Sequence, residues 1–154
     1  MNRILATAIA IIGIAGFNTL FADEEPMHMG NHHHDMMSIV DTRTSLGVTG
    51  PMKLHQLENM RSHVEAIKNI VGLLSESKFD EASAIAHNKL GLTPDMQAMC
   101  GMFNNENFEK LGLAFHKSGD ELGDTLKTKD VNASLRALNK TMQFCVECHA
   151  TYRQ

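Results

Sequence analysis

Beyond residue 50, apolar residues recur at alternating spacings of three and four, the period of an amphipathic helix. The pattern predicts four helices, at about 51–76, 81–90, 105–127 and 131–152. Pro51 suits a first helical turn, because the N–H that proline lacks would have no partner there. No two segments have a pattern that predicts a pair of β-strands. The sequence therefore predicts an all-α fold, an antiparallel four-helix bundle with short connections.

The first and last helices each carry one apolar stripe that should face the core. In the first helix the stripe is Leu57, Met60, Val64, Ile67, Val71 and Leu74. In the last helix it is Val131, Leu135, Leu138, Met142, Cys145 and His149. Asp80 and Asp130 stand where side chains can cap the second and fourth helices. His55, His87 and His116 lie off the apolar stripes, so we expect them on the surface.

The first 22 residues have the pattern of a secretory signal peptide. One positive charge at Arg3 precedes an apolar run, 4–17, and the small residue Ala22 precedes a polar boundary. The run is too short to cross a bilayer comfortably, although an uncleaved membrane anchor is the alternative. We expect cleavage after Ala22, a periplasmic mature chain and no membrane span within it.

Residues 23–50 show no helical or alternating period and are expected to form a flexible tether. This segment is rich in methionine and histidine: Met27, His28, Met29, His32, His33, His34, Met36 and Met37. Thioethers suit Cu(I) and imidazoles suit Cu(II), so these residues are candidate copper ligands. The alternative is a polar tether whose histidines bind metals only weakly.

The motif Cys-Val-Glu-Cys-His at 145–149 is the attachment signature of c-type haem. Cys145 and Cys148 can each add to one vinyl group of a haem, and the imidazole of His149 can reach the iron. A thioredoxin-like pair would need a βαβ context, which is missing. A zinc site would need a second pair of ligands, and Cys100 alone does not supply one. The motif therefore predicts one covalent haem on the last helix.

The motif ends the last helix and continues to Tyr152 and Arg153, giving C-x-x-C-H-x-x-Y-R near the C-terminus. This arrangement resembles cytochrome c prime and its low-spin c-556-type relatives, across residues 51–154. The resemblance implies that Cys145 and Cys148 form thioether bonds and that His149 is the proximal ligand. It also implies that Tyr152 and Arg153 lie near the proximal side, where Arg153 could offset propionate charge.

The sixth position of the iron decides the function. In the family this position is filled from the first helix, and counting along the stripe brings Met60 to it. A methionine on a stripe can equally be core filler, and His63 is the rival ligand. Leu57 and Val64 would be apolar neighbours. Ligation by Met60 predicts electron transfer, whereas an open position predicts binding of nitric oxide or carbon monoxide.

The net charge of the chain limits the kind of macromolecule that it can bind. Removing the leader with Arg3 takes the net charge from −4 to −5, which argues against nucleic acid. A redox protein is the expected partner, and bundles of this family often form homodimers through their first two helices. Cys100 is expected to be a small buried residue, or else to pair between subunits. No general acid or base is placed by the sequence, so no enzymatic activity is predicted.

Overall fold

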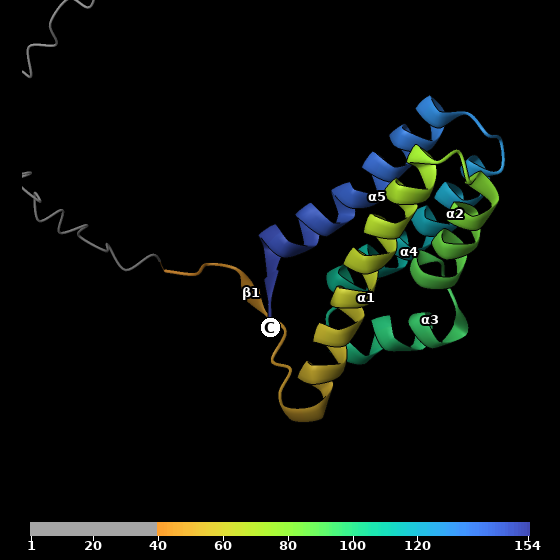
Figure 1. The fold of residues 1–154 in the computed structure, drawn as a ribbon. Helices are drawn as coiled ribbons and strands as arrows, with labels where there is room; N and C mark the ends of the chain where they lie inside the picture. The colour runs from red at the N-terminus through yellow and green to blue at the C-terminus, as the bar shows by residue number, and fades with distance from the viewer. Residues whose placement is uncertain (1–39) are drawn as a thin grey trace, which may run out of the picture. The chain divides into compact units, whose positions relative to one another are not determined.

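A computed structural model describes residues 40–154, and this part of the chain is mostly helical, as predicted (Figure 1). The predicted signal peptide and most of the predicted tether lie outside the described residues. The elements are β1 (Thr44–Ser45), α1 (Gly50–Ser75), α2 (Phe79–Ile85), the π-helical turn η1 (Ala86–Leu90), α3 (Pro94–Cys100), the 3₁₀ turn η2 (Gly101–Phe103), α4 (Glu106–Leu126), α5 (Val131–Thr151) and β2 (Tyr152–Arg153).

The ends of the helices follow local capping chemistry. The side chain of Asp130 accepts hydrogen bonds from the backbone N–H groups of Asn132 and Ala133, at 2.9 and 3.0 Å, as predicted for a cap. The predicted cap at Asp80 is wrong, because α2 already begins at Phe79. The turn after α1 is short, and the N–H of Lys78 donates back to the carbonyl of Leu73 at 2.8 Å. That tight turn starts α2 before Asp80 is reached.

A dry core occupies one end of the helical unit. There α1 packs against α2 and η1, while α4 packs against α2, η1 and α5. The core side chains include Ile70, Leu74, Leu90, Leu122, Leu126 and Leu138. Gly119 permits the close approach of η1 to α4, since a Cβ there would collide with the carbonyl of Leu90. These contacts fix α1, η1 and α4 relative to one another.

The buried face of α1 differs from the predicted stripe. The structure buries Gln56, His63, Ala66, Ile70 and Leu74. Two predicted stripe residues, Val64 and Val71, are 68% and 48% exposed. The core-facing side is therefore rotated by roughly one residue position, about 100° for an α-helix. Apolar residues such as Val64 and Val71 also lie beside that face, so apolar spacing alone predicts the wrong side of the helix.

The buried face of α5 is narrower than predicted. Ser134, Leu138 and Thr141 are buried, whereas the predicted stripe residues Val131, Leu135 and Met142 are exposed. The hydroxyl of Thr141 donates to the carbonyl of Ser118 on α4 at 3.1 Å. Small hydroxyl side chains thus let α5 lie close to α4, and a pattern based on apolar residues overlooks them.

A short strand pair joins the two ends of the described chain. β1 and β2 are parallel, with Thr44 opposite Tyr152 and Ser45 opposite Arg153. Figure 1 shows β1 beside the C-terminus, below the end of α5. The compact unit therefore begins at Val40. The prediction of a tether as far as residue 50 is wrong for residues 40–50, where backbone pairing orders a segment without periodic apolar residues.

Within residues 40–154, no helix combines the length and the apolar character needed to cross a bilayer.

Candidate functional site

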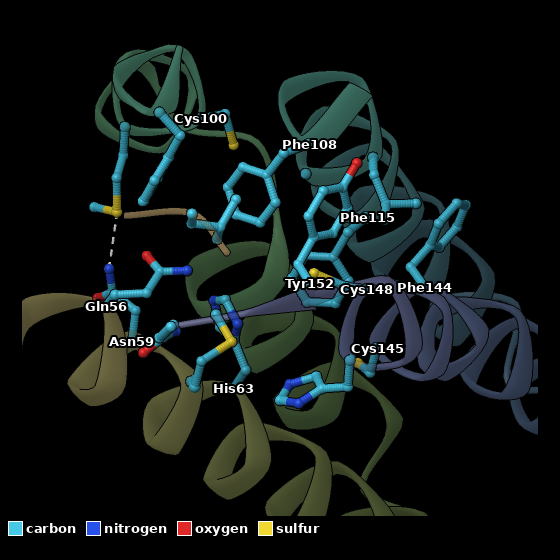
Figure 2. Close-up of a pocket in the computed structure, with 18 of the residues that line it drawn as sticks. Gln56, Asn59, His63, Cys100, Phe108, Phe115, Phe144, Cys145, Cys148 and Tyr152 are labelled. Atoms are coloured by element: carbon cyan, nitrogen blue, oxygen red, sulfur yellow. Dashed lines mark hydrogen bonds between the residues drawn. The ribbon is translucent and has the colours of Figure 1, made fainter. Parts of the chain in front are cut away.

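A cavity of about 340 Å³ lies at the end of the unit opposite the dry core. This volume is within the range of cofactor and ligand pockets. Its walls come from α1, α3, α4, the last turns of α5 and the segment around β1. Figure 2 shows Gln56, Asn59 and His63 projecting from α1 on one side, with Cys145 and Cys148 on the α5 side. Residues that are distant in the sequence thus surround one space.

The three residues of the C-x-x-C-H motif all line this cavity. Cys145 and Cys148 are half-buried, and both are free thiols. Burial raises the pKa of the Cys145 thiol. Burial, followed by the charges of Cys145, Glu147 and Cys100, raises the pKa of Cys148 to about 11. Both groups are therefore neutral thiols near pH 7, in a largely apolar setting.

The wall of α1 brings both predicted distal candidates to the cavity. Met60 and His63 line it, together with the predicted neighbour Leu57. The prediction for Val64 is wrong: its side chain is exposed and does not line the cavity. The reason is the rotation of α1, which turns Val64 away from the core-facing side and brings His63 inward.

His63 is the more deeply buried of the two candidates, with 8% of its surface exposed. Its ring packs against Phe115 and His116, with centroids 4.9 and 5.5 Å away. Burial, and then the nearby His116, lower the pKa of His63 to about 4. The ring is therefore uncharged at neutral pH, with its nitrogen lone pair unprotonated.

His116 also lines the cavity, although the sequence pattern placed it on the surface. Its Nδ1 donates to the carbonyl of Leu90 at 2.9 Å. Burial lowers the pKa of His116 despite that hydrogen bond. The buried face of α4 is wide enough to include both His116 and the preceding residue, Phe115.

Aromatic and sulfur-containing side chains form the remaining walls. Phe108 lies edge-on to Tyr152, with ring centroids 5.2 Å apart, and the tyrosine is buried. Cys100 is buried, as predicted, and Gly112 of α4 makes room for its Sγ atom. Asn59 donates to the Sδ atom of Met99 at 2.9 Å.

Two arginines stand at the edge of the cavity. Arg153 was predicted to lie there, whereas Arg43 falls in the segment predicted as tether. Arg43 Nη1 donates to the carbonyl of His149 at 3.3 Å, across 106 positions of sequence. Sequence spacing carries no signal for this contact, since it depends on the pairing of β1 with β2.

The predicted copper ligands at 27–37 lie outside the described residues. Within residues 40–154, no three His, Cys, Asp or Glu side chains come together in an arrangement able to hold a bare metal ion. The zinc alternative for the C-x-x-C pair thus gains no second set of ligands in this part of the chain.

Comparison with protein-family models, with curated proteins and with solved structures gives no match for this chain.

Proposed function

We propose that this protein is an exported, periplasmic c-type cytochrome that carries one haem and transfers electrons. Cys145 and Cys148 bind the haem covalently, and His149 is the proximal iron ligand. The observation that carries the proposal is the single cavity lined by these three residues, by aromatic side chains, and by Met60 and His63 on the facing helix.

The lining fits a haem in its chemistry. The Phe103, Phe108, Phe115 and Phe144 side chains offer apolar contacts to a flat macrocycle, and Arg153 offers positive charge to propionates. The raised thiol pKa values separate this pair from redox-active C-x-x-C motifs, whose attacking thiol has a lowered pKa. At neutral pH the pair is thus poorly suited to disulfide exchange.

Within this proposal the helices form a four-helix bundle of the cytochrome c prime type, with α1, α2, α4 and α5 as its members. When bound, a haem supplies one-electron exchange at its iron. The protein holds the proximal imidazole at the end of α5, excludes water with aromatic side chains and offers the Met60 thioether from α1. His/Met ligation favours a high potential, which suits an electron carrier with a redox protein as partner.

Attachment is tested by producing the full chain in a bacterium that exports it and matures c-type cytochromes. The protein should keep its haem on a denaturing gel, and C145A/C148A should lose all of it. The C100A variant is the matched control, because Cys100 also lines the cavity but lies outside the motif. A wild-type protein without covalent haem would refute the proposal.

The sixth ligand is tested by optical and EPR spectra of the ferric protein. We expect a low-spin wild type, a high-spin M60A variant and a low-spin H63A variant. A low-spin signal lost in H63A alone would move ligation to the imidazole. A high-spin wild type that binds carbon monoxide would replace electron transfer by gas binding at an open iron.

A further inference from the structure

The segment Asp41–Val48, here called the strap, is attached to the residues that follow the C-x-x-C-H motif. β1 within it pairs with β2, and the N–H of Leu46 donates to the carbonyl of Arg153 at 3.0 Å. In return, Arg153 Nε donates to the carbonyl of Arg43 at 3.3 Å. Val48, at the end of the strap, is buried. The strap is therefore a bonded part of the cavity end.

Arg43 supplies the end of α5 with a partner that the helix itself lacks. The last carbonyls of a helix have no intrahelical donor, and a cation there is favourable to the helix dipole. The only basic side chain in the last turn of α5 is His149, which faces the cavity. Arg43 Nη1 reaches the carbonyl of His149 from the strap and satisfies this acceptor.

Asp41 fixes the plane of the Arg43 guanidinium. Its Oδ1 accepts from Nε at 2.9 Å and its Oδ2 accepts from Nη2 at 2.8 Å, a two-pronged ion pair. Arg153 Nε lies 3.8 Å from the same carboxylate. Because Asp41 holds the Nε and Nη2 atoms of Arg43, the Nη1 atom of Arg43 is directed at the backbone carbonyl of His149. Asp41 thus lies between the two arginines, and Arg43 alone reaches the peptide carbonyl of His149.

We propose that Arg43 is a positioning residue for His149 and that the strap belongs to the candidate haem site. The Asp41–Arg43 pair holds the Cys148–His149 turn against the strap and so sets the direction of the imidazole toward the cavity. Partners that orient a metal-ligating histidine tune the metal as well as hold it. The consequence for a haem rests on the proposed function; the fixing of the turn does not.

Amide hydrogen exchange of the full chain tests the fixing of the turn. In R43Q, exchange at the Leu46 and Tyr152 amides should rise about tenfold, the loss expected for one hydrogen bond from a charged group. D41N should act in the same direction, by a smaller factor. R136Q is the matched control, since Arg136 is exposed on the same helix, α5, and should leave both amides unchanged. Unchanged exchange in R43Q would overturn the proposal.

The midpoint potential separates positioning from charge alone. If Arg43 acts through the orientation of His149, then R43Q and D41N shift the potential in the same direction. R43K should resemble R43Q, because lysine lacks the planar fork. If charge alone matters, R43Q lowers the potential, D41N raises it and R43K restores it; that pattern would refute positioning.

The two proposals can fail separately. Faster exchange in R43Q in a protein without covalent haem would refute the cytochrome and keep the strap as the anchor of α5. Covalent haem with unchanged exchange and potential in R43Q would keep the cytochrome and refute the role of Arg43.

Discussion

The two halves of α1 have different surroundings. In the second half, Ala66, Ile70 and Leu74 are buried among the side chains of α2, η1 and α4, and Ile70 has no exposed surface. In the first half the buried residues are polar, Gln56 and His63, and they face the cavity. The second half of α1 thus packs in an apolar core, whereas its first half contributes to a cavity lined by polar and sulfur-containing side chains.

This difference indicates which part of the fold is self-sufficient. Close-packed apolar contacts stabilise the core end without any further group. The cavity end has an internal space lined by His63, His116 and the motif cysteines, so the side chains around it make fewer packing contacts. We infer that the core end holds the chain together while the cavity end is shaped for an occupant.

The largest effect should come from the core end. Ile70→Ala should lower the free energy of unfolding by about 3–4 kcal/mol, through lost apolar burial and the void left behind. Val71→Ala, at the adjacent but half-exposed position, should cost less than about 1 kcal/mol. Urea denaturation of both variants measures this. Equal losses would mean that the boundary between core and surface on α1 is drawn in the wrong place.

A smaller effect should appear as a pH dependence of the cavity end. In a haem-free C145S/C148S chain, His63 has its ordinary pKa of 6.5 in the unfolded state and a pKa of about 4 in the folded state. The unfolded state then binds more protons, so stability should fall by about 2–3 kcal/mol as the pH drops through this window.

The pH dependence of stability has a matched control at another histidine of α1. H63F should flatten the decrease, with a residual slope from His116, whose pKa is also lowered by burial. H55A should keep the full decrease, since His55 is exposed. A haem-free chain that is unfolded at neutral pH would contradict the self-sufficiency of the core end.

The smallest effect should be at Val64. Because this side chain is 68% exposed, Val64→Ser should change the free energy of unfolding by about 0.5 kcal/mol or less. Thermal denaturation at two protein concentrations measures it. A loss of several kcal/mol at high concentration alone would show that a second copy covers this face of α1.

The sequence predicts the helices well and their faces less well. Helix length and the cap at Asp130 are local properties, so α4 and α5 were predicted within one residue. The buried faces depend on neighbouring helices: Thr141 is buried because it bonds to α4, and Val64 is exposed because α1 turns His63 inward.

In the candidate site, too, features set by the local sequence could be predicted, and features set by distant segments could not. The motif residues 145–149 are adjacent in sequence, so they could be identified from it. Met60 and His63 could be assigned to the cavity by counting along one helix. Arg43 and His116 could not, because their places depend on a strand pair and on the packing of η1 against α4.

The end of η1 also decides where a proton lies. Leu90 is the last residue of η1, and the last carbonyls of a helix have no donor within it, so this carbonyl is available to His116 Nδ1. A carbonyl can only accept, so the neutral ring of His116 must be the Nδ1–H tautomer, with a bare lone pair on Nε2. The terminal carbonyl of η1 thus selects one of two isomeric imidazoles beside His63.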